Sequence, residues 1–157
     1  MLFQFQEYLT FENIYIYSSF GVLPFWLLLM AIPNSRITQI FVNSIILPII
    51  LSTAYIYVLY QSILLGEPFI DIFKIYLNID NLYTVFATES FLLFFWIHFL
   101  ALNLFLGSWV SRDSVKYNIP RKIIFFPLIF IYFAGPVGLV MYWFFRIFYS
   151  KKLGLHD

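Results

Sequence analysis

Charged residues divide the chain into long apolar stretches. Asp, Glu, Lys and Arg are all missing from four of them, which span residues 13–35, 37–66, 90–111 and 123–145. A membrane-spanning helix needs about 20 apolar residues to cross about 30 Å of hydrocarbon. Inside a bilayer the backbone polar groups must pair with one another, and this requirement favours helices. The pattern therefore predicts four transmembrane helices near residues 14–32, 38–65, 83–107 and 122–149.

The predicted fold is all-α, a polytopic membrane protein whose four transmembrane helices form a bundle. The sequence has no repeats and no low-complexity linker, so we expect one membrane domain over 1–157. The second and fourth helices are long enough that tilt or kinking is expected. Prolines inside the spans each remove a backbone hydrogen bond, which neighbouring helices can replace. They are Pro24, Pro48, Pro127 and Pro136.

Composition supports lipid as the solvent of this chain. Hydrophobic residues make up 62% of it and charged residues 11%, whereas soluble domains carry about a quarter charged residues. The net charge of +1 gives no electrostatic case for nucleic acid as a partner. Cysteine is absent, which excludes disulfides and thiolate metal sites. With His98 and His156 as the only histidines, a multi-histidine di-iron site is excluded too, and we expect no metal.

The termini and loops indicate little about orientation. The N-terminal segment lacks a basic region and carries Glu7 and Glu12, so we expect no cleavable targeting peptide. Four crossings would place both termini on the same side. One predicted side then holds Arg36, Arg112, Lys116, Arg121 and Lys122, and the other holds Lys74, Arg146, Lys151 and Lys152. Five basic residues against four is too small a difference for the positive-inside rule, although it leans towards both termini outside.

Glu89 is the one charged residue well inside a predicted span. An ionisable group in a membrane is costly and is by default a hypothesis of function. At 100° per residue, Glu89 shares one line of its helix with Leu93, Trp96, Leu100, Asn103 and Gly107. This seam combines a carboxylic acid, an indole, an amide and a glycine that allows close approach. The alternative is that Glu89 lies near the membrane surface and reaches water.

Two further residues could carry proton chemistry. His98 is about 180° around the predicted helix from Glu89, and it suits a general acid or base, an axial ligand or a hydrogen-bonded packing residue. Asp113 follows Arg112 just beyond the predicted third helix, where a solvated loop pair is the usual interpretation.

Aromatic residues suggest a ligand surface. Tyr57 and Tyr60 share a face of the second predicted helix, Tyr132 lies on the fourth, and 21 phenylalanines accompany them. Such side chains suit a long, flat, apolar ligand such as a polyene, although tyrosines also form belts at membrane surfaces. In the fourth helix Gly135, Pro136 and Gly138 allow a kink and close packing. We expect His98 and this Gly-Pro break to face the protein interior.

Residues 96–109, WIHFLALNLFLGSW, resemble the signature of the abscisic-acid-deficient-4-like (neoxanthin-synthase-like) membrane proteins. The similarity continues through Arg112-Asp113, Ile119-Pro120 and 133–139, FAGPVGL. It covers most of the chain and is strongest from about residue 85 to 145. The family's pattern has an aspartate where this chain has Asn103, so the seam lacks that carboxylate. Matching positions are His98, Gly107, Arg112, Asp113, Pro120, Gly135, Pro136 and Gly138.

The resemblance implies a role in carotenoid or isoprenoid metabolism. Plant members are chloroplast membrane proteins needed to make neoxanthin from violaxanthin, an isomerisation that needs an acid and a base but no metal or flavin. It therefore implies a cofactor-free isomerase with Glu89, His98 and Asp113 as catalytic candidates. The candidate ligand-binding residues are Trp96, Asn103, Tyr57, Tyr60 and Tyr132. Composition suggests a bacterial member in the inner membrane; a eukaryotic one would lie in a plastid membrane.

Other classes of function stay open at this stage. One is a non-catalytic pigment- or lipid-binding accessory subunit, in a homo-oligomer or a larger membrane complex. Another is a small transporter, which a single buried carboxylate hardly supports. Bound polyene would favour an enzyme or a binder over a transporter, and turnover would separate the enzyme from the binder.

Overall fold

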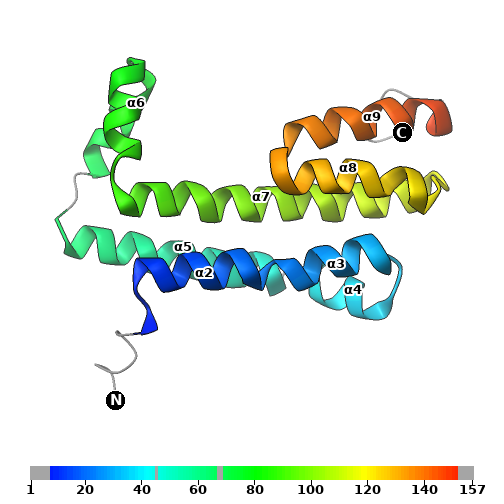
Figure 1. Cartoon of the computed structure of the whole chain (residues 1–157), viewed down its shortest axis with the longest axis horizontal. Helices are drawn as coiled ribbons and strands as arrows, with labels where there is room; N and C mark the ends of the chain where they lie inside the picture. Colours follow the sequence, from blue (N-terminus) through cyan, green and yellow to red (C-terminus); the bar gives the residue numbers. More distant parts are fainter. Residues whose placement is uncertain (1–7, 45, 67–68, 152–157) are drawn as a thin grey trace. The chain divides into compact units, whose positions relative to one another are not determined.

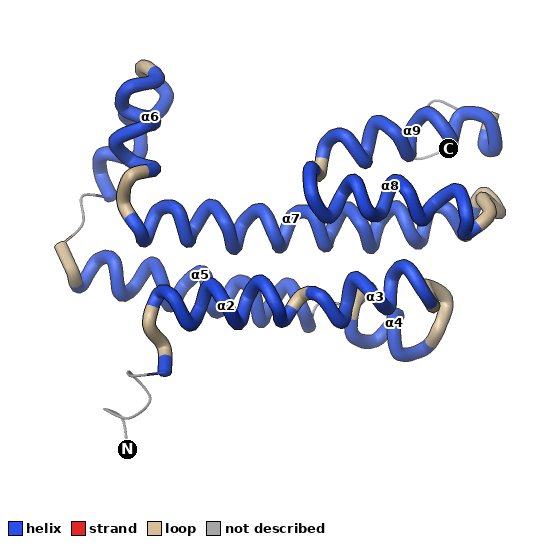
Figure 2. Tube along the Cα trace, viewed as in Figure 1, coloured by secondary structure: helices blue, strands red, loops and turns tan. Residues whose placement is uncertain are grey.

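The computed structural model describes residues 8–44, 46–66 and 69–151, and over these residues it is helical without strands (Figure 2). The all-α prediction is therefore confirmed for the described part of the chain. Two compact units divide the chain, and each is assembled from separate stretches of sequence. The first unit combines the chain up to Gly21 with Ile49–Phe99, and the second combines Val22–Pro48 with the chain from Leu100 onwards.

Three helical stretches are long and apolar enough to cross a membrane. They are Phe11–Ala31, Arg36–Leu64 and Glu89–Lys116, with mean hydropathies of 1.7, 1.9 and 1.9. The second includes residue 45, which lies outside the described residues. These stretches correspond to the first three predicted crossings. The predicted count of four transmembrane helices is not confirmed.

The first crossing consists of two consecutive helices, α2 Phe11–Gly21 and α3 Leu23–Ala31. Pro24 lies in the first turn of α3, where a backbone N–H would have no partner within the helix. After α3 the chain turns, and the Ser35 hydroxyl caps α4 Arg36–Phe41 by accepting from the Thr38 amide at 3.1 Å. The helix α5 Ile46–Leu64 completes the second crossing.

The predicted third helix, 83–107, is shifted in the structure. The short helix η1 Phe69–Tyr76 and the helix α6 Ile79–Phe86 precede it, and α6 ends before the long helix α7 Glu89–Lys116 begins. The Asn78 side chain caps α6 by accepting from the Asn81 amide at 2.8 Å. The third crossing therefore starts at Glu89 and includes the polar residues after Gly107.

The predicted fourth helix, 122–149, is wrong as a single helix. It is a hairpin of α8 Arg121–Ala134 and α9 Pro136–Ser150, which pack side by side in the second unit (Figure 1). Gly135 between them has a φ of 34°, a left-handed value that a residue with a Cβ rarely adopts. Pro136 adds to the break because it has no N–H to continue the helical hydrogen-bond ladder.

Close contacts fill the space around this break. A Cβ atom on Gly138 would collide with the Ile131 amide nitrogen and the Pro127 carbonyl oxygen of α8. A Cβ on Gly135 would lie 2.5 Å from Oδ1 of Asn103, halfway along α7. The Asn103 amide in turn donates a hydrogen bond of 3.5 Å to the Tyr132 carbonyl oxygen, close to the end of α8. The break thus packs against α7. Gly135 is buried as expected and Gly138 is buried as well, but Pro136 is exposed, so the prediction that the Gly-Pro break faces the interior holds for the glycine alone.

Neither arm of the hairpin is long enough to cross a bilayer. The 14 residues of α8 and the 15 of α9 extend about 21 and 22 Å at 1.5 Å per residue, against about 30 Å of hydrocarbon. Their outer ends meet at the same end of α7. Arg146 of α9 bonds Asp113 of α7 at 2.7 Å, and α8 begins just after α7 ends. We therefore expect the hairpin to enter and leave on one side, as buried non-helical backbone in membranes can.

We predict three crossings and a re-entrant hairpin, with the two termini on opposite sides of the membrane. Eight of the nine Lys and Arg residues then lie on one side of the membrane, and only Lys74 lies on the other. Of the eight Asp and Glu residues, only Asp113 and Asp157 lie on the side with the eight basic residues. The positive-inside rule orients such a chain with its C-terminus inside. Reporters at Lys116 and after Asp157 should report the same compartment, and one at Met1 the opposite compartment. If both terminal reporters report the same compartment, the prediction of three crossings is wrong and four crossings are favoured.

We predict that Gly135→Leu lowers the free energy of unfolding by about 2 kcal/mol or more, because overpacking at a strained backbone position is costly. The measurement is the unfolding transition of the purified protein in detergent. Gly21→Leu is the matched control, since no atom lies within 4 Å of a Cβ at Gly21. Equal transitions for the two variants would show that the break is not closely packed.

Candidate functional site

An open pocket of about 640 Å³ lies in the first unit, between the first turns of α2 and the first turns of α7. Its volume is within the range typical of sites for small organic ligands. Apolar and aromatic side chains form most of its wall. The lining residues are Phe11, Glu12, Tyr15, Glu89, Leu92, Leu93, Phe95 and Trp96.

Two carboxylates belong to this pocket. Glu12 lies in the first turn of α2 and Glu89 in the first turn of α7. Each is at a helix N-terminus, where the aligned backbone dipoles favour a negative charge. Both side chains are exposed, so they form the polar edge of an otherwise apolar cavity.

Trp96 is held in a fixed orientation at the wall of the pocket. Its indole Nε1 donates a hydrogen bond of 2.8 Å to the Ser19 hydroxyl. Its ring stacks on Phe99 at a centroid distance of 5.6 Å and meets Tyr15 at 5.8 Å. The indole therefore offers a positioned flat surface at the wall of the pocket, and a ligand-binding role for Trp96 stays a prediction.

The prediction that Glu89 lies well inside a span is wrong. α7 begins at Glu89, so this residue is at the end of the third crossing and its side chain is exposed. The rest of the predicted seam is a packing face, since Leu93, Leu100 and Asn103 are all buried. Gly107 continues it, with a Cβ position only 2.6 Å from Cη2 of Trp26. Asn103 belongs to the second unit, so it is no part of this pocket.

His98 does not face the protein interior as expected; its side chain is exposed. The buried side of this part of α7 consists of Leu93, Ile97, Leu100 and Leu104. His98 follows Ile97 by 100° around the helix and so points away from that side.

The three candidate tyrosines are divided between the units. On α5 of the first unit, the Tyr57 hydroxyl accepts from Gln61 Nε2 at 2.8 Å, and Tyr60 is 57% exposed. In the second unit, the Tyr132 ring meets Trp26 edge-on at 5.4 Å. None of the three lines the pocket of the first unit, so a ligand role for them stays a prediction.

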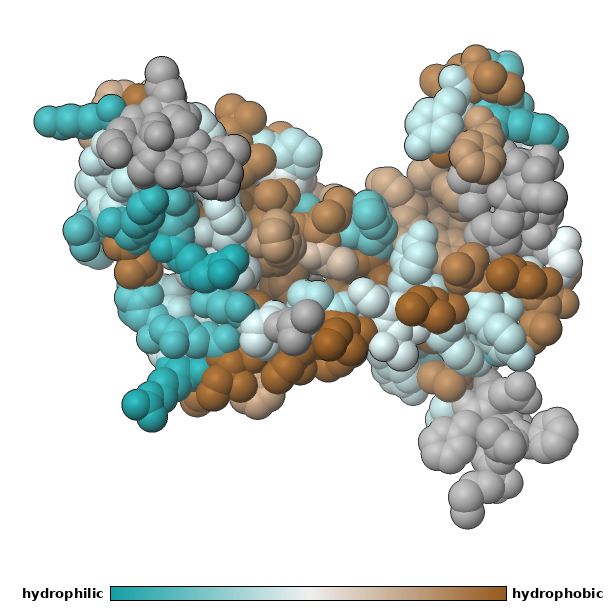
Figure 3. Space-filling view, turned by 180° about the vertical axis from the view of Figure 1, so that it is seen from behind, coloured by the Kyte–Doolittle hydropathy of each residue, from teal (hydrophilic) through white to brown (hydrophobic). Residues whose placement is uncertain are grey.

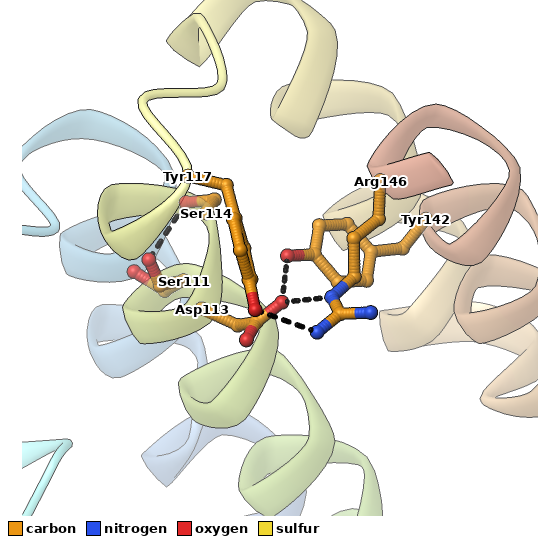
Figure 4. Close-up of polar contacts among 6 residues, drawn as sticks. All are labelled: Ser111, Asp113, Ser114, Tyr117, Tyr142 and Arg146. Carbon is orange, nitrogen blue, oxygen red and sulfur yellow. Dashed lines mark hydrogen bonds and ion pairs between the residues drawn. The ribbon is translucent and has the colours of Figure 1, made fainter. Parts of the chain in front are cut away.

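Asp113 is not in a solvated loop. It lies in the last turns of α7 and is 8% exposed. The Tyr142 hydroxyl donates to its Oδ2 at 2.5 Å, and Arg146 Nε donates to the same oxygen at 2.7 Å (Figure 4). Arg146 is fully buried, and its Nη2 donates to the Tyr117 hydroxyl at 3.1 Å. The guanidinium also lies over the Tyr117 ring, 4.7 Å from its centroid.

This buried cluster joins the end of α7 to α9. Its two charges neutralise each other, and hydrogen bonds from two partners occupy Oδ2 of the carboxylate. The remaining Nη1 of Arg146 is buried and has no hydrogen-bond partner among the described residues. Asp113 does not line the carboxylate pocket of the first unit. The geometry therefore favours a role for Asp113 in positioning the hairpin.

Sequence reasoning missed Glu12 and Arg146 as functional candidates. Arg146 lies within the predicted fourth helix and enters the sequence analysis only as a basic residue of one membrane side, although its spacing of four residues from Tyr142 places both on one face of a helix. That spacing was the available signal for the cluster. For Glu12 no signal was available, because nothing in the sequence indicates that it shares a pocket with Glu89.

The helices, the apolar spans and the buried polar cluster together define a polytopic helical membrane protein. A family model described as ABA DEFICIENT 4-like matches residues 13–142. The match covers most of the chain, and the chain therefore belongs to the ABA DEFICIENT 4-like family, as the residues between 96 and 139 predicted. No curated protein and no solved structure matches the chain. The matched region includes Glu89 and Asp113, whereas Glu12 and Arg146 lie just outside it.

We predict that Asp113→Asn lowers the free energy of unfolding by about 3–5 kcal/mol, because it leaves the buried Arg146 cation without its counter-charge. Denaturation of the purified protein in detergent measures the change. Arg112→Gln is the control, since it removes an exposed charge one residue away. If the two variants are equally stable, the Asp113–Arg146 pair does not hold the hairpin.

Proposed function

We propose that this protein is a membrane isomerase of carotenoid or isoprenoid metabolism that acts on an epoxy-carotenoid-like polyene. Membership of the ABA DEFICIENT 4-like family supports the substrate class. The observation that carries the proposal is a pair of carboxylates, Glu12 and Glu89, at the edge of one apolar, aromatic pocket of about 640 Å³. The proposed location is the inner membrane of a bacterium, or a plastid membrane in a eukaryote.

The position of the pocket suits an amphipathic polyene. α2 and α7 both start at this pocket, so it lies at the end of two crossings, where hydrocarbon meets water. An oxygenated carotenoid ring lies at such a boundary, while its polyene chain extends into the hydrocarbon. The rings of Tyr15, Phe95 and Trp96 give the flat walls that a conjugated ligand would contact.

Two carboxyl groups are sufficient for the reaction. One removes a proton from the polyene carbon next to the epoxide, and the electron pair of that C–H bond forms the second double bond of an allene. The epoxide C–O bond breaks, and its oxygen takes a proton from the other carboxyl group. Atoms and electrons balance without an oxidant or reductant, so substrate and product are isomers.

We predict that Glu89→Gln and Glu12→Gln each reduce turnover by roughly 10²-fold or more, the usual scale of an acid–base contribution. Glutamine keeps the size of the side chain but neither donates nor accepts the catalytic proton. The assay incubates protein in lipid nanodiscs with an epoxy-carotenoid such as violaxanthin and separates the products chromatographically. Retained carotenoid is measured by its visible absorption in the same samples.

Asp80→Asn is the matched control, because Asp80 is an exposed carboxylate in the first turn of α6 and does not line the pocket. It should leave turnover unchanged. If the wild type retains carotenoid but does not convert it, the proposed enzyme function is wrong and the alternative, a pigment-binding accessory subunit, is favoured. Unchanged turnover in both glutamine variants would remove the two carboxylates from the mechanism.

A further inference from the structure

A second pocket, of about 260 Å³, lies in the second unit at the C-terminal end of α7. The end of α3, the turn after it, the end of α7 and the start of α8 surround it. Its wall combines two kinds of side chain. Polar groups come from Asn34, Ser111, Ser114, Asn118 and Arg121, and apolar groups from Leu29, Ile124, Phe125 and Leu128.

Ser111 gives this pocket a buried polar group. Its side chain is 2% exposed, and it lines the pocket. Its backbone carbonyl accepts from the Ser114 hydroxyl at 2.7 Å. Ser111 and Ser114 lie on the side of α7 that faces away from Arg146 and Tyr142 (Figure 4). The pocket is therefore separate from the buried ion pair.

The charge at this end of the unit is strongly positive. Arg121 lines the pocket and donates from Nη1 to the Ala31 carbonyl oxygen at 3.1 Å, while the rest of its exposed guanidinium remains available to a ligand. Lys122 and Arg112 are exposed nearby in the sequence. Asp113, the one acid of the second unit's described residues, is neutralised by Arg146. Figure 3 shows hydrophilic residues gathered over this end beside hydrophobic surface.

The length of the uncharged part of α7 indicates how deep the pocket lies in a membrane. The uncharged residues 90–111 of this helix extend about 33 Å, close to the hydrocarbon thickness of about 30 Å. Ser111 therefore lies at the boundary, and Arg112 begins the layer of lipid head groups. Below that layer Phe125 is 43% exposed, and Phe126 and Phe130 are also exposed on the same helix.

We propose that this pocket binds the phosphate head group of an anionic membrane phospholipid. The Arg121 guanidinium and the hydroxyl of Ser111 donate hydrogen bonds to the phosphate oxygens, because phosphate offers only acceptors and favours charge-assisted bonds. An acyl chain of the same lipid lies against Phe125. The lipid would join the end of the first crossing to the start of the hairpin. The proposal is independent of the reaction proposed for the first unit.

The test measures lipid binding to the full-length protein in detergent by native mass spectrometry. Phosphatidylglycerol should bind more tightly than phosphatidylcholine, since both carry a phosphate but only the first is anionic. Arg121→Gln should weaken phosphatidylglycerol about tenfold or more, the scale of a lost charge-assisted hydrogen bond. Ser111→Ala should weaken it by a smaller factor, because it removes one neutral donor.

Arg112→Gln is the matched control, because Arg112 is exposed next to Ser111 but does not line the pocket. If Arg112→Gln weakens phosphatidylglycerol binding as much as Arg121→Gln does, the proposal is overturned, since general surface charge would then explain the binding. Equal affinity for the two lipids would overturn it as well. Displacement of the lipid by millimolar inorganic phosphate would identify a free-anion site and contradict a lipid site. Unfolding transitions of all variants confirm that each protein is folded.

Discussion

A helix that breaks inside a membrane must satisfy its freed backbone groups within the protein, and the second unit is organised around that constraint. At Gly135 the chain leaves helical geometry, and the amide of Asn103 donates to the nearby Tyr132 carbonyl oxygen. The absence of a side chain at Gly138 lets α9 approach the backbone of α8 closely. At the other end of the hairpin, Arg146 reaches Asp113. One polar contact thus secures the tip of the hairpin against α7, and an ion pair secures its outer end.

Burial explains why the ion pair is confined to the last turns of α7. A charge taken out of water needs a partner and further hydrogen bonds, and Tyr117 and Tyr142 provide them. The guanidinium also lies over the Tyr117 ring. The cluster occupies the part of α7 that follows its apolar stretch, where the cost of two charges is lower than at the centre of the bilayer. The arrangement therefore favours a role for Asp113 in positioning the hairpin.

The two pockets differ in chemistry in a way that matches the distribution of charge along the chain. The first unit presents carboxylates beside aromatic rings, which suits an acid–base reaction on a conjugated, uncharged ligand. The second presents a guanidinium and hydroxyls beside aliphatic side chains, which suits an anion attached to a hydrocarbon chain. Most acidic residues come before Arg112 in the sequence, and most basic residues come at or after it. The helix α7 itself begins with Glu89 and ends with Lys116. This polarity also agrees with the helix dipole, which favours acids at the first turn and bases at the last.

The sequence by itself determined the solvent, the helical class and the family. Hydropathy is a property of each residue's transfer from water, so the uncharged stretches predicted four crossings without knowledge of any partner, and three of them correspond to helices long and apolar enough to cross a membrane. Helical periodicity placed Leu93, Leu100 and Asn103 on one line of α7, and the structure showed that this line is a packing face. The tertiary structure alone decided that 122–149 folds back at Gly135, because an apolar segment can cross or return depending on what satisfies its broken backbone. It also decided that Asp113 meets Arg146 and that Glu12 shares a pocket with Glu89. Those pairings join residues 33 and 77 positions apart, and neither periodicity nor composition carries information about contacts between separate helices.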